Sequence, residues 1–350
     1  MDIGRDDFDK LMNSFKNNNI EEFAQLIDSG FSINCLNSKK CSLISEMMKQ
    51  TDKDHARKFI DMLFDMSVSL RKIGRERSLL SIATDMHKDS YYLKKLLAKN
   101  MNINSVGVYG RRGDYGYDDP VIFNAMQHLN DDFINLLLDH KPDLGAENSR
   151  GITALNYLIE VYCKNNEYER LLPIFERFLE LGADPEISSR DGSRALHVLA
   201  MFANNEKLFD ILFENTKNLM LNTRNEYCNT PLILAARNGN LIGIKYLIKV
   251  GAALDAIGNY NYTAILKSII HDENEIFNCL LDSGADLFIV DKNKDNILHH
   301  ICKNEEYETS CHGKYFKEIS KLHPELLDMK NTEDKTPLEI LRYNEKECEL

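Results

Sequence analysis

The sequence predicts an all-α protein in which pairs of helices are stacked along the chain. The first observation is a fixed period, because Thr230 lies 33 residues before Thr263 and Gly251 lies 33 residues before Gly284. The second is a shared order of residues, from a threonine through two apolar stretches to Leu-x-x-Gly-Ala, with Ile248 in the place of Leu in the repeat that begins at Thr230. The third is a composition of 43% hydrophobic residues, which allows a large buried core, with only 17 glycines and 7 prolines, so the chain is not rich in linkers. Such a period is typical of repeats that bury apolar surface by stacking.

Each residue type in the repeat has a place in a helix–turn–helix unit. Thr230 can cap a first helix, because its side-chain oxygen accepts from a free N–H of the first turn, and Pro231 suits the first helical position. The small pair Ala235-Ala236 lets this helix lie close to its neighbour. A second helix is expected to end before Gly251, where a residue that tolerates positive φ is favoured. The apolar stripe of that second helix is Ile244, Leu247 and Ile248.

Positions equivalent to Gly251 recur along the chain and define its organisation. We follow them as Gly30, Ser67, Asn100, Lys141, Gly182, about Thr216, Gly251 and Gly284. They predict one array over residues 1–350, with about nine to ten units and no separate catalytic domain. The expected parts are an N-terminal cap over about 1–37, an extended finger over about 105–119 and a partial C-terminal repeat over about 331–350. Two insertions, Cys163–Arg170 and Tyr307–Lys314, are expected to lengthen turns between helices.

One segment carries a family resemblance. The run NTPLILAARNGN, from Asn229 to Asn240, resembles the ankyrin core Gly-x-Thr-Pro-Leu-His-x-Ala-Ala-x-x-Gly, with Asn229 in place of Gly and Ile233 in place of His. Weaker copies are DGSRALHVLA (Asp191–Ala200) and KDNILHHIC (Lys294–Cys302). The resemblance implies an ankyrin-repeat solenoid with hairpin fingers that binds other proteins, through fingers and the ends of the inner helices.

Composition and charge narrow the function. The net charge of -12 argues against nucleic-acid binding and favours a cationic or mixed partner. The charge is unevenly distributed, because the segment Arg71–Arg112 has ten basic and three acidic residues. The first ten residues, MDIGRDDFDK, carry charges where a signal peptide needs an apolar core. Eight cysteines in a chain without an export signal indicate reduced thiols and a cytoplasmic protein. No apolar run approaches the ~18 residues of a membrane span. We expect a chain that is monomeric when free.

The run VGVYGRRGDYGYDDP, residues 106–120, has a glycine at every third place from Gly107 to Gly116. It lacks the Gly-Lys-Ser/Thr of a phosphate loop. Its GRRG would need a KH fold to bind RNA, and an RGD adhesion role conflicts with a cytosolic composition. Two interpretations remain, a hairpin without a role and a finger that contacts a partner protein. The second would use Tyr109, Arg111, Arg112, Tyr115 and Tyr117.

The ends of the first helices are the other candidate contacts. Aligned with Arg237-Asn238, these ends are Gln127-His128, Glu160-Val161, Met201-Phe202 and Ile270-His271. Met201 and Phe202 are more apolar than a solvated end requires, so they are expected to be partly exposed and to contact the partner; the alternative is that local helices cover them. The candidates chosen from this group are His128, Met201, Phe202, Arg237 and His271.

Metal and catalytic motifs were weighed as well. Short His/Cys spacings at His299–Cys302 and Cys311–Gly313 are compatible with zinc ligands. The ankyrin resemblance implies instead that the His299 ring bonds the backbone of the adjoining hairpin and that Cys302 fills the small-residue place of Ala236. No serine or cysteine lies in a recognisable motif with a paired histidine. The sequence therefore predicts no metal, no cofactor and no enzyme activity.

The functional hypothesis is a scaffold that binds and inhibits or sequesters a partner protein. An immunity-type role against a basic toxin or enzyme suits the acidic charge. A host-directed effector or adaptor, which would then act in the host cytosol, is the alternative, and an enzyme with an unrecognised site is the remote one.

Overall fold

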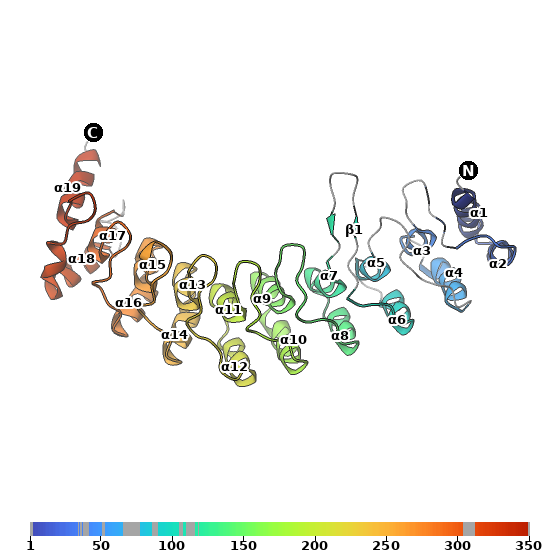
Figure 1. Cartoon of the computed structure of the whole chain (residues 1–350), viewed down its shortest axis with the longest axis horizontal. Coiled ribbons are helices and arrows are strands. Elements are labelled where there is room, and N and C mark those ends of the chain that lie inside the picture. Colours follow the sequence, from blue (N-terminus) through green and yellow to red (C-terminus); the bar gives the residue numbers. More distant parts are fainter. Residues whose placement is uncertain are drawn as a thin grey trace. The chain divides into compact units, whose positions relative to one another are not determined.

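The fold is described by a computed structural model of the chain. It covers residues 3–33, 35, 37, 42–50, 53–65, 78–85, 90–104, 108–109, 116–117, 119–303 and 312–348. Contacts within the chain divide it into two compact units, Met1–Arg150 and Gly151–Leu350. Each unit is a succession of helix pairs, which confirms the all-α fold class (Figure 1). Within the described ranges, no helix is long and apolar enough to span a lipid bilayer.

In the unit Gly151–Leu350 the helices form two layers. The first helix of each pair packs against the first helix of the next pair, and the second helices do the same (Figure 1). The first helices are α9 (Ala154–Lys164), α11 (Ala195–Phe202), α13 (Pro231–Arg237) and α15 (Ala264–Ile270). The second helices are α10 (Tyr168–Glu180), α12 (Glu206–Asn215), α14 (Leu241–Lys249) and α16 (Asn274–Asp282). The short 3-10 helix η1 (Asn259–Asn261) precedes α15. Helix α17 (Ile297–Lys303) packs on α15, and is followed by α18 (His312–Leu322), the 3-10 helix η2 (Pro324–Leu327) and α19 (Pro337–Cys348).

The unit Met1–Arg150 repeats the same pairing with shorter or less regular members. Its pairs are α1 (Ile3–Lys16) with α2 (Ile20–Asp28), α3 (Leu43–Met48) with α4 (Lys53–Asp65), α5 (Leu79–Asp85) with α6 (Tyr91–Ala98), and α7 (Val121–Gln127) with α8 (Asp131–Asp139). Between α6 and α7 lie the strands β1 (Val108–Tyr109) and β2 (Gly116–Tyr117), which pair antiparallel. The expected finger is therefore a hairpin at its base, and its tip lies outside the described residues.

The helix caps follow the expected chemistry. The Thr230 hydroxyl accepts from the Ile233 N–H at 3.4 Å, and Pro231 occupies the start of α13. Asn240 caps α14 by accepting from the Gly243 N–H at 2.8 Å. Its buried amide also donates to three carbonyls of the preceding repeat, those of Leu199, Ala200 and Ala203. The turn between α13 and α14 is thus anchored to α11, a contact that sequence reasoning did not anticipate.

The insertion Cys163–Arg170 does not lengthen a turn, so that prediction was wrong. Helix α9 continues to Lys164 and α10 begins at Tyr168, so both helices extend to 11 and 13 residues, against 7 and 9 in α13 and α14. The connection itself stays short, and Asn166 turns it with a φ of 58°. The second predicted insertion, Tyr307–Lys314, lies mostly outside the described ranges, and its end falls in α18.

Positive φ after the second helices confirms the predicted glycine positions. Gly182, Gly251 and Gly284 have φ of 91°, 87° and 87°. Asn100 and Lys141 take the same place in their repeats with φ of 53° and 51°. The alignment was wrong at Thr216, whose φ of -122° is extended. Asn218, two residues later, has the positive φ instead.

Five turns in the unit Gly151–Leu350 connect each second helix to the next first helix. In each, the first residue donates its N–H to the carbonyl of the fifth, at 2.9 to 3.1 Å. We call these segments the repeat turns: 189–193, 225–229, 258–262, 291–295 and 331–335. Three are joined to the preceding turn by a backbone hydrogen bond. These bonds run from Glu226 to Asp191, from Lys292 to Tyr260 and from Thr332 to Asn293, at 2.9, 2.9 and 2.8 Å.

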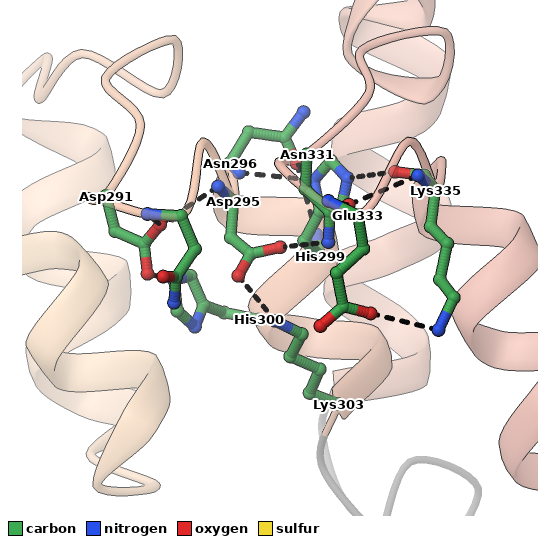
Figure 2. A network of polar contacts seen from close by, with 10 residues as sticks. Asp291, Asp295, Asn296, His299, His300, Lys303, Asn331, Glu333 and Lys335 are labelled. Atoms are coloured by element: carbon green, nitrogen blue, oxygen red, sulfur yellow. Dashed lines mark hydrogen bonds and ion pairs between the residues drawn. The ribbon is translucent and has the colours of Figure 1, made fainter.

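Two buried histidines join a first helix to the following turn. The His299 Nδ1 accepts from the Asn296 N–H at 3.1 Å, and its Nε2 donates to the Lys335 carbonyl at 3.1 Å (Figure 2). This confirms the expected role of His299. His197 repeats the arrangement, with Nδ1 accepting from Arg194 N–H at 3.3 Å and Nε2 facing the Thr223 carbonyl at 3.0 Å. Burial lowers the pKa of His197 to about 4, so the ring is neutral near pH 7.

We expect Gly251→Val to destabilise the fold by roughly 1–3 kcal/mol, because a β-branched residue is strained at positive φ. A Cβ at Gly251 would meet no atom within 4 Å, so the loss would report backbone strain alone. Urea denaturation measures it. Gly251→Asn is the matched control and should lose less, since asparagine tolerates this region. Equal midpoints for the valine variant and the parent would contradict this explanation.

Acid should weaken the fold through His197. The folded-state pKa of about 4 lies below the unfolded value of 6.5, so between these values the unfolded chain binds the extra proton. Stability should therefore fall as pH drops from 7 to 4, with a contribution from this residue of about 3 kcal/mol. Denaturant titrations at several pH values test this against His197→Asn, which should show a flatter dependence. An NMR titration with His197 protonated at pH 6 would refute it.

Candidate partner-binding surface

The unit Gly151–Leu350 presents aromatic rings at two successive repeat turns. Tyr227 is 60% exposed and Tyr260 is 50% exposed. Sequence reasoning did not select either residue. The signal that could have found them is a tyrosine at the middle of a five-residue turn, the position most distant from the helices. An exposed tyrosine there is notable because its ring can bury a large apolar area on a partner.

A run of contacts leads from Tyr260 along helix α15. The Tyr260 and Tyr262 ring centroids lie 6.3 Å apart. The Lys267 ammonium lies 4.0 Å from the Tyr262 ring centroid, and the Lys292 ammonium lies 3.8 Å from that of Tyr260. Both distances allow cation–π attraction. These aromatic rings are therefore bordered by positive charge.

The same run continues to Arg237 and His271. Burial lowers the pKa of Lys267, and the Arg237 charge lowers it further. Burial also lowers the pKa of His271, with further contributions from Lys267 and Arg237. Charges that shift one another's pKa values lie close in space. We call Arg237, Tyr260, Tyr262, Lys267 and His271 the basic–aromatic surface; Arg237, Tyr260 and His271 are exposed and the other two are half-buried.

Most predicted helix-end residues lie where the alignment placed them. Arg237 ends α13, His271 follows α15, and His128 follows α7 with its side chain exposed. Met201 and Phe202 end α11 and are half-buried. They are therefore neither fully exposed nor fully covered by the local helices.

One predicted helix end was wrong. Glu160-Val161 lies inside α9, which continues for another turn to Lys164. The Lys164 ammonium takes the place beside Phe202, at 4.7 Å from its ring centroid. Phe202 is thus partly covered by a lysine chain from the neighbouring repeat, which explains its incomplete exposure.

The finger candidates are only partly placed. Tyr109 lies in β1 and Tyr117 in β2, where Tyr109 pairs with Gly116 and Val108 with Tyr117. Arg111, Arg112 and Tyr115 fall outside the described residues. The structure therefore brings together Arg237 and His271 of the predicted set, and leaves the finger's contribution a prediction.

Comparisons with known proteins agree with this architecture. Residues 162–257 and 196–291 match a family model described as ankyrin repeats in three copies. A 140-residue stretch is 29% identical to the human transient receptor potential cation channel subfamily A member 1. The match covers 38% of this chain and 12% of that channel, so the chain corresponds to a small part of that relative.

Among solved structures, a match is to the ankyrin repeat domain of Bcl-3, described as a unique member of the IκB protein family. It is 18% identical, with a TM-score of 0.49, and the alignment covers 66% of this chain and 95% of that one. The family identification itself rests on the matched residues and on the helix pairs, turns and caps described above. Residues 162–291 therefore carry ankyrin repeats, and helix pairs of the same kind continue on both sides of them.

Proposed function

We propose that this protein is a binding scaffold whose partner protein docks on the basic–aromatic surface. The observation that supports this most is the contact run from Tyr260 to His271, which combines exposed tyrosine with arginine and lysine. Tyrosine and arginine are the residue types that contribute most at protein interfaces. The rings would lose water and the cations would meet acidic side chains or carbonyl groups.

Rigidity of the backbone supports the proposal. The turn that carries Tyr260 is closed by the Gly258–Tyr262 hydrogen bond at 2.9 Å and bonded to the next turn through Lys292. A partner therefore has little backbone to order when it binds, and ordering is a main cost of association. The tyrosine side chains add contact area with only two side-chain torsions each.

The finer role that we propose is sequestration of another protein. A chain of net charge -12 with a local basic surface suits a partner of mixed charge, such as a basic toxin or enzyme that has an acidic patch. This is the immunity-type role; a host-directed effector or adaptor is the alternative. A cytoplasmic location fits the free thiols of Cys35, Cys163, Cys228, Cys279 and Cys302.

Two substitutions test the surface. A pull-down from the source organism, read by mass spectrometry, identifies the partner. Tyr260→Ser combined with Arg237→Glu should then weaken its affinity by at least tenfold, because it removes a ring and reverses a charge within one contact run. Calorimetry or interferometry measures the affinity.

The matched control is Leu322→Ser on α18, an apolar side chain that is 71% exposed and lies outside the surface. It should leave affinity unchanged, and both variants should keep the parent's melting temperature. Affinity that survives the double substitution, in a folded protein, would show that the partner docks elsewhere.

The finger is proposed as a second contact. Deleting Gly107–Tyr117 and closing the gap with a short turn should preserve the melting temperature and weaken binding. Replacing Arg111 and Arg112 by Glu should mainly slow association, in a salt-dependent way. Stopped-flow association rates at two salt concentrations measure this. Unchanged affinity and rate in both variants would leave the finger without a role in binding.

A further inference from the structure

Three potential metal ligands meet at the repeat turn 291–295. Asp291, Asp295 and His300 each bring one ligand atom to the same place, with all three atoms within 4.8 Å of one another (Figure 2). Asp291 and Asp295 are buried, and the His300 side chain is 9% exposed. This is a different set from the His299–Cys302 spacing weighed in the sequence. The ring nitrogens of His299 hold the repeat turns together, so only His300 is shared with that run.

Both carboxylates are held in place by their other oxygen. Asp291 Oδ1 accepts from the N–H groups of Asn293 and Asp295, at 2.7 and 2.9 Å. Asp295 Oδ1 accepts from the Asn331 amide at 2.9 Å. One oxygen of each carboxylate therefore remains directed at the cluster. Hydrogen bonds that orient ligands in this way are typical of protein metal sites.

The turn itself does not need a negative charge at position 291. Asn225 and Asn331 begin their turns and accept the same pair of backbone N–H groups through an uncharged amide oxygen. Asp291 thus places a charged carboxylate at a buried position where the equivalent turns use the neutral amide of Asn225 or Asn331. A buried charge is costly unless it is compensated. The second oxygen of Asp291 takes no part in the turn and faces the His300 ring instead.

That second oxygen has a partner of suitable geometry for metal binding. Asp291 Oδ2 and His300 Nε2 lie 3.4 Å apart, within ion-pair distance, and within the described structure neither atom makes a hydrogen bond to any other group. A tetrahedral ion with bonds of about 2.0–2.2 Å separates its ligand atoms by roughly 3.3–3.6 Å. The two atoms are therefore spaced as ligands of one ion. Asp295 Oδ2 completes the set, and at present contacts the Lys303 ammonium.

We propose that Asp291, Asp295 and His300 bind a divalent transition-metal ion, with Zn²⁺ as the best-matched ion. An imidazole with two carboxylates is a mixed nitrogen and oxygen set, which suits zinc, whereas calcium and magnesium select oxygen ligands. Lys303 competes for Asp295, and its side chain is 42% exposed, so it can move into solvent when the ion binds. A water molecule would supply the fourth ligand.

Isothermal titration of the untagged chain of residues 1–350 with ZnSO4 tests the proposal. We expect one saturable site that is lost in Asp291→Asn and in His300→Ala. The asparagine variant keeps the turn, as positions 225 and 331 show, so the loss would not reflect misfolding. Lys303→Met should tighten binding about tenfold, because it removes a competing positive charge. Zinc should also raise the melting temperature of the parent protein.

Control variants separate this site from incidental zinc ligands. His323→Ala removes a half-buried histidine whose Nδ1 lies 3.6 Å from Glu325 Oε1, and Cys228→Ser removes an exposed thiol. Both should bind zinc as the parent does. Binding that persists in Asp291→Asn and His300→Ala, or no saturable binding at all, would overturn the proposal. Weaker zinc binding in Lys303→Met would also overturn the proposal, because it would show that the lysine does not compete with the ion.

Discussion

The structure of the unit Gly151–Leu350 depends on the hydrogen bonds that join one repeat turn to the next. A turn of five residues cannot satisfy its own polar backbone, and unsatisfied buried groups are costly. Here the turn residues bond the preceding turn, and His197 and His299 tie a first helix to the following turn. In three of the five repeat turns, a backbone hydrogen bond to the preceding turn thus adds to the apolar stacking of the helices. This is why a repeat of this kind is stable only within an array.

The geometry of the repeat turns also determines which of their side chains are exposed and which are buried. Where a turn begins with Asn225, Asp291 or Asn331, that side chain points inward to accept two N–H groups and is buried. The middle residue of the turn points away from the helices, which exposes Tyr227 and Tyr260. One backbone pattern therefore produces exposed side chains at the middle of the turns and, at the start of the turn 291–295, an interior carboxylate. The proposed binding surface and the proposed ion site are two results of one local geometry.

Much of this fold could be predicted from the sequence because its signals are local. Thr230 and Pro231 mark a helix start, and Gly182, Gly251 and Gly284 mark positive φ, wherever the rest of the chain lies. The extra residues after Cys163 were harder, because a count of residues does not tell whether an insertion joins the turn or extends the helices. The surface and the Asp291–His300 cluster were hardest. The members of the surface are separated in sequence and meet only once the register of neighbouring turns is known. Asp291, Asp295 and His300 lie within one repeat, but they converge through the fold of the turn 291–295 onto the start of α17, which motif spacing does not show.

The two proposals meet at repeat turn 291–295. This turn carries Lys292, whose ammonium lies against the Tyr260 ring, and the His300 ring lies 5.8 Å from that of Tyr262. An ion held by Asp291, Asp295 and His300 would fix both the turn and the start of the contact run along α15. It would also release Lys303 into solvent and add positive charge beside the surface. Because coupling between two sites is reciprocal, a partner that prefers the stiffened surface would bind more tightly with the ion present, and would in turn tighten the ion. The chain would then bind its partner in a metal-dependent way through residues that never touch that partner.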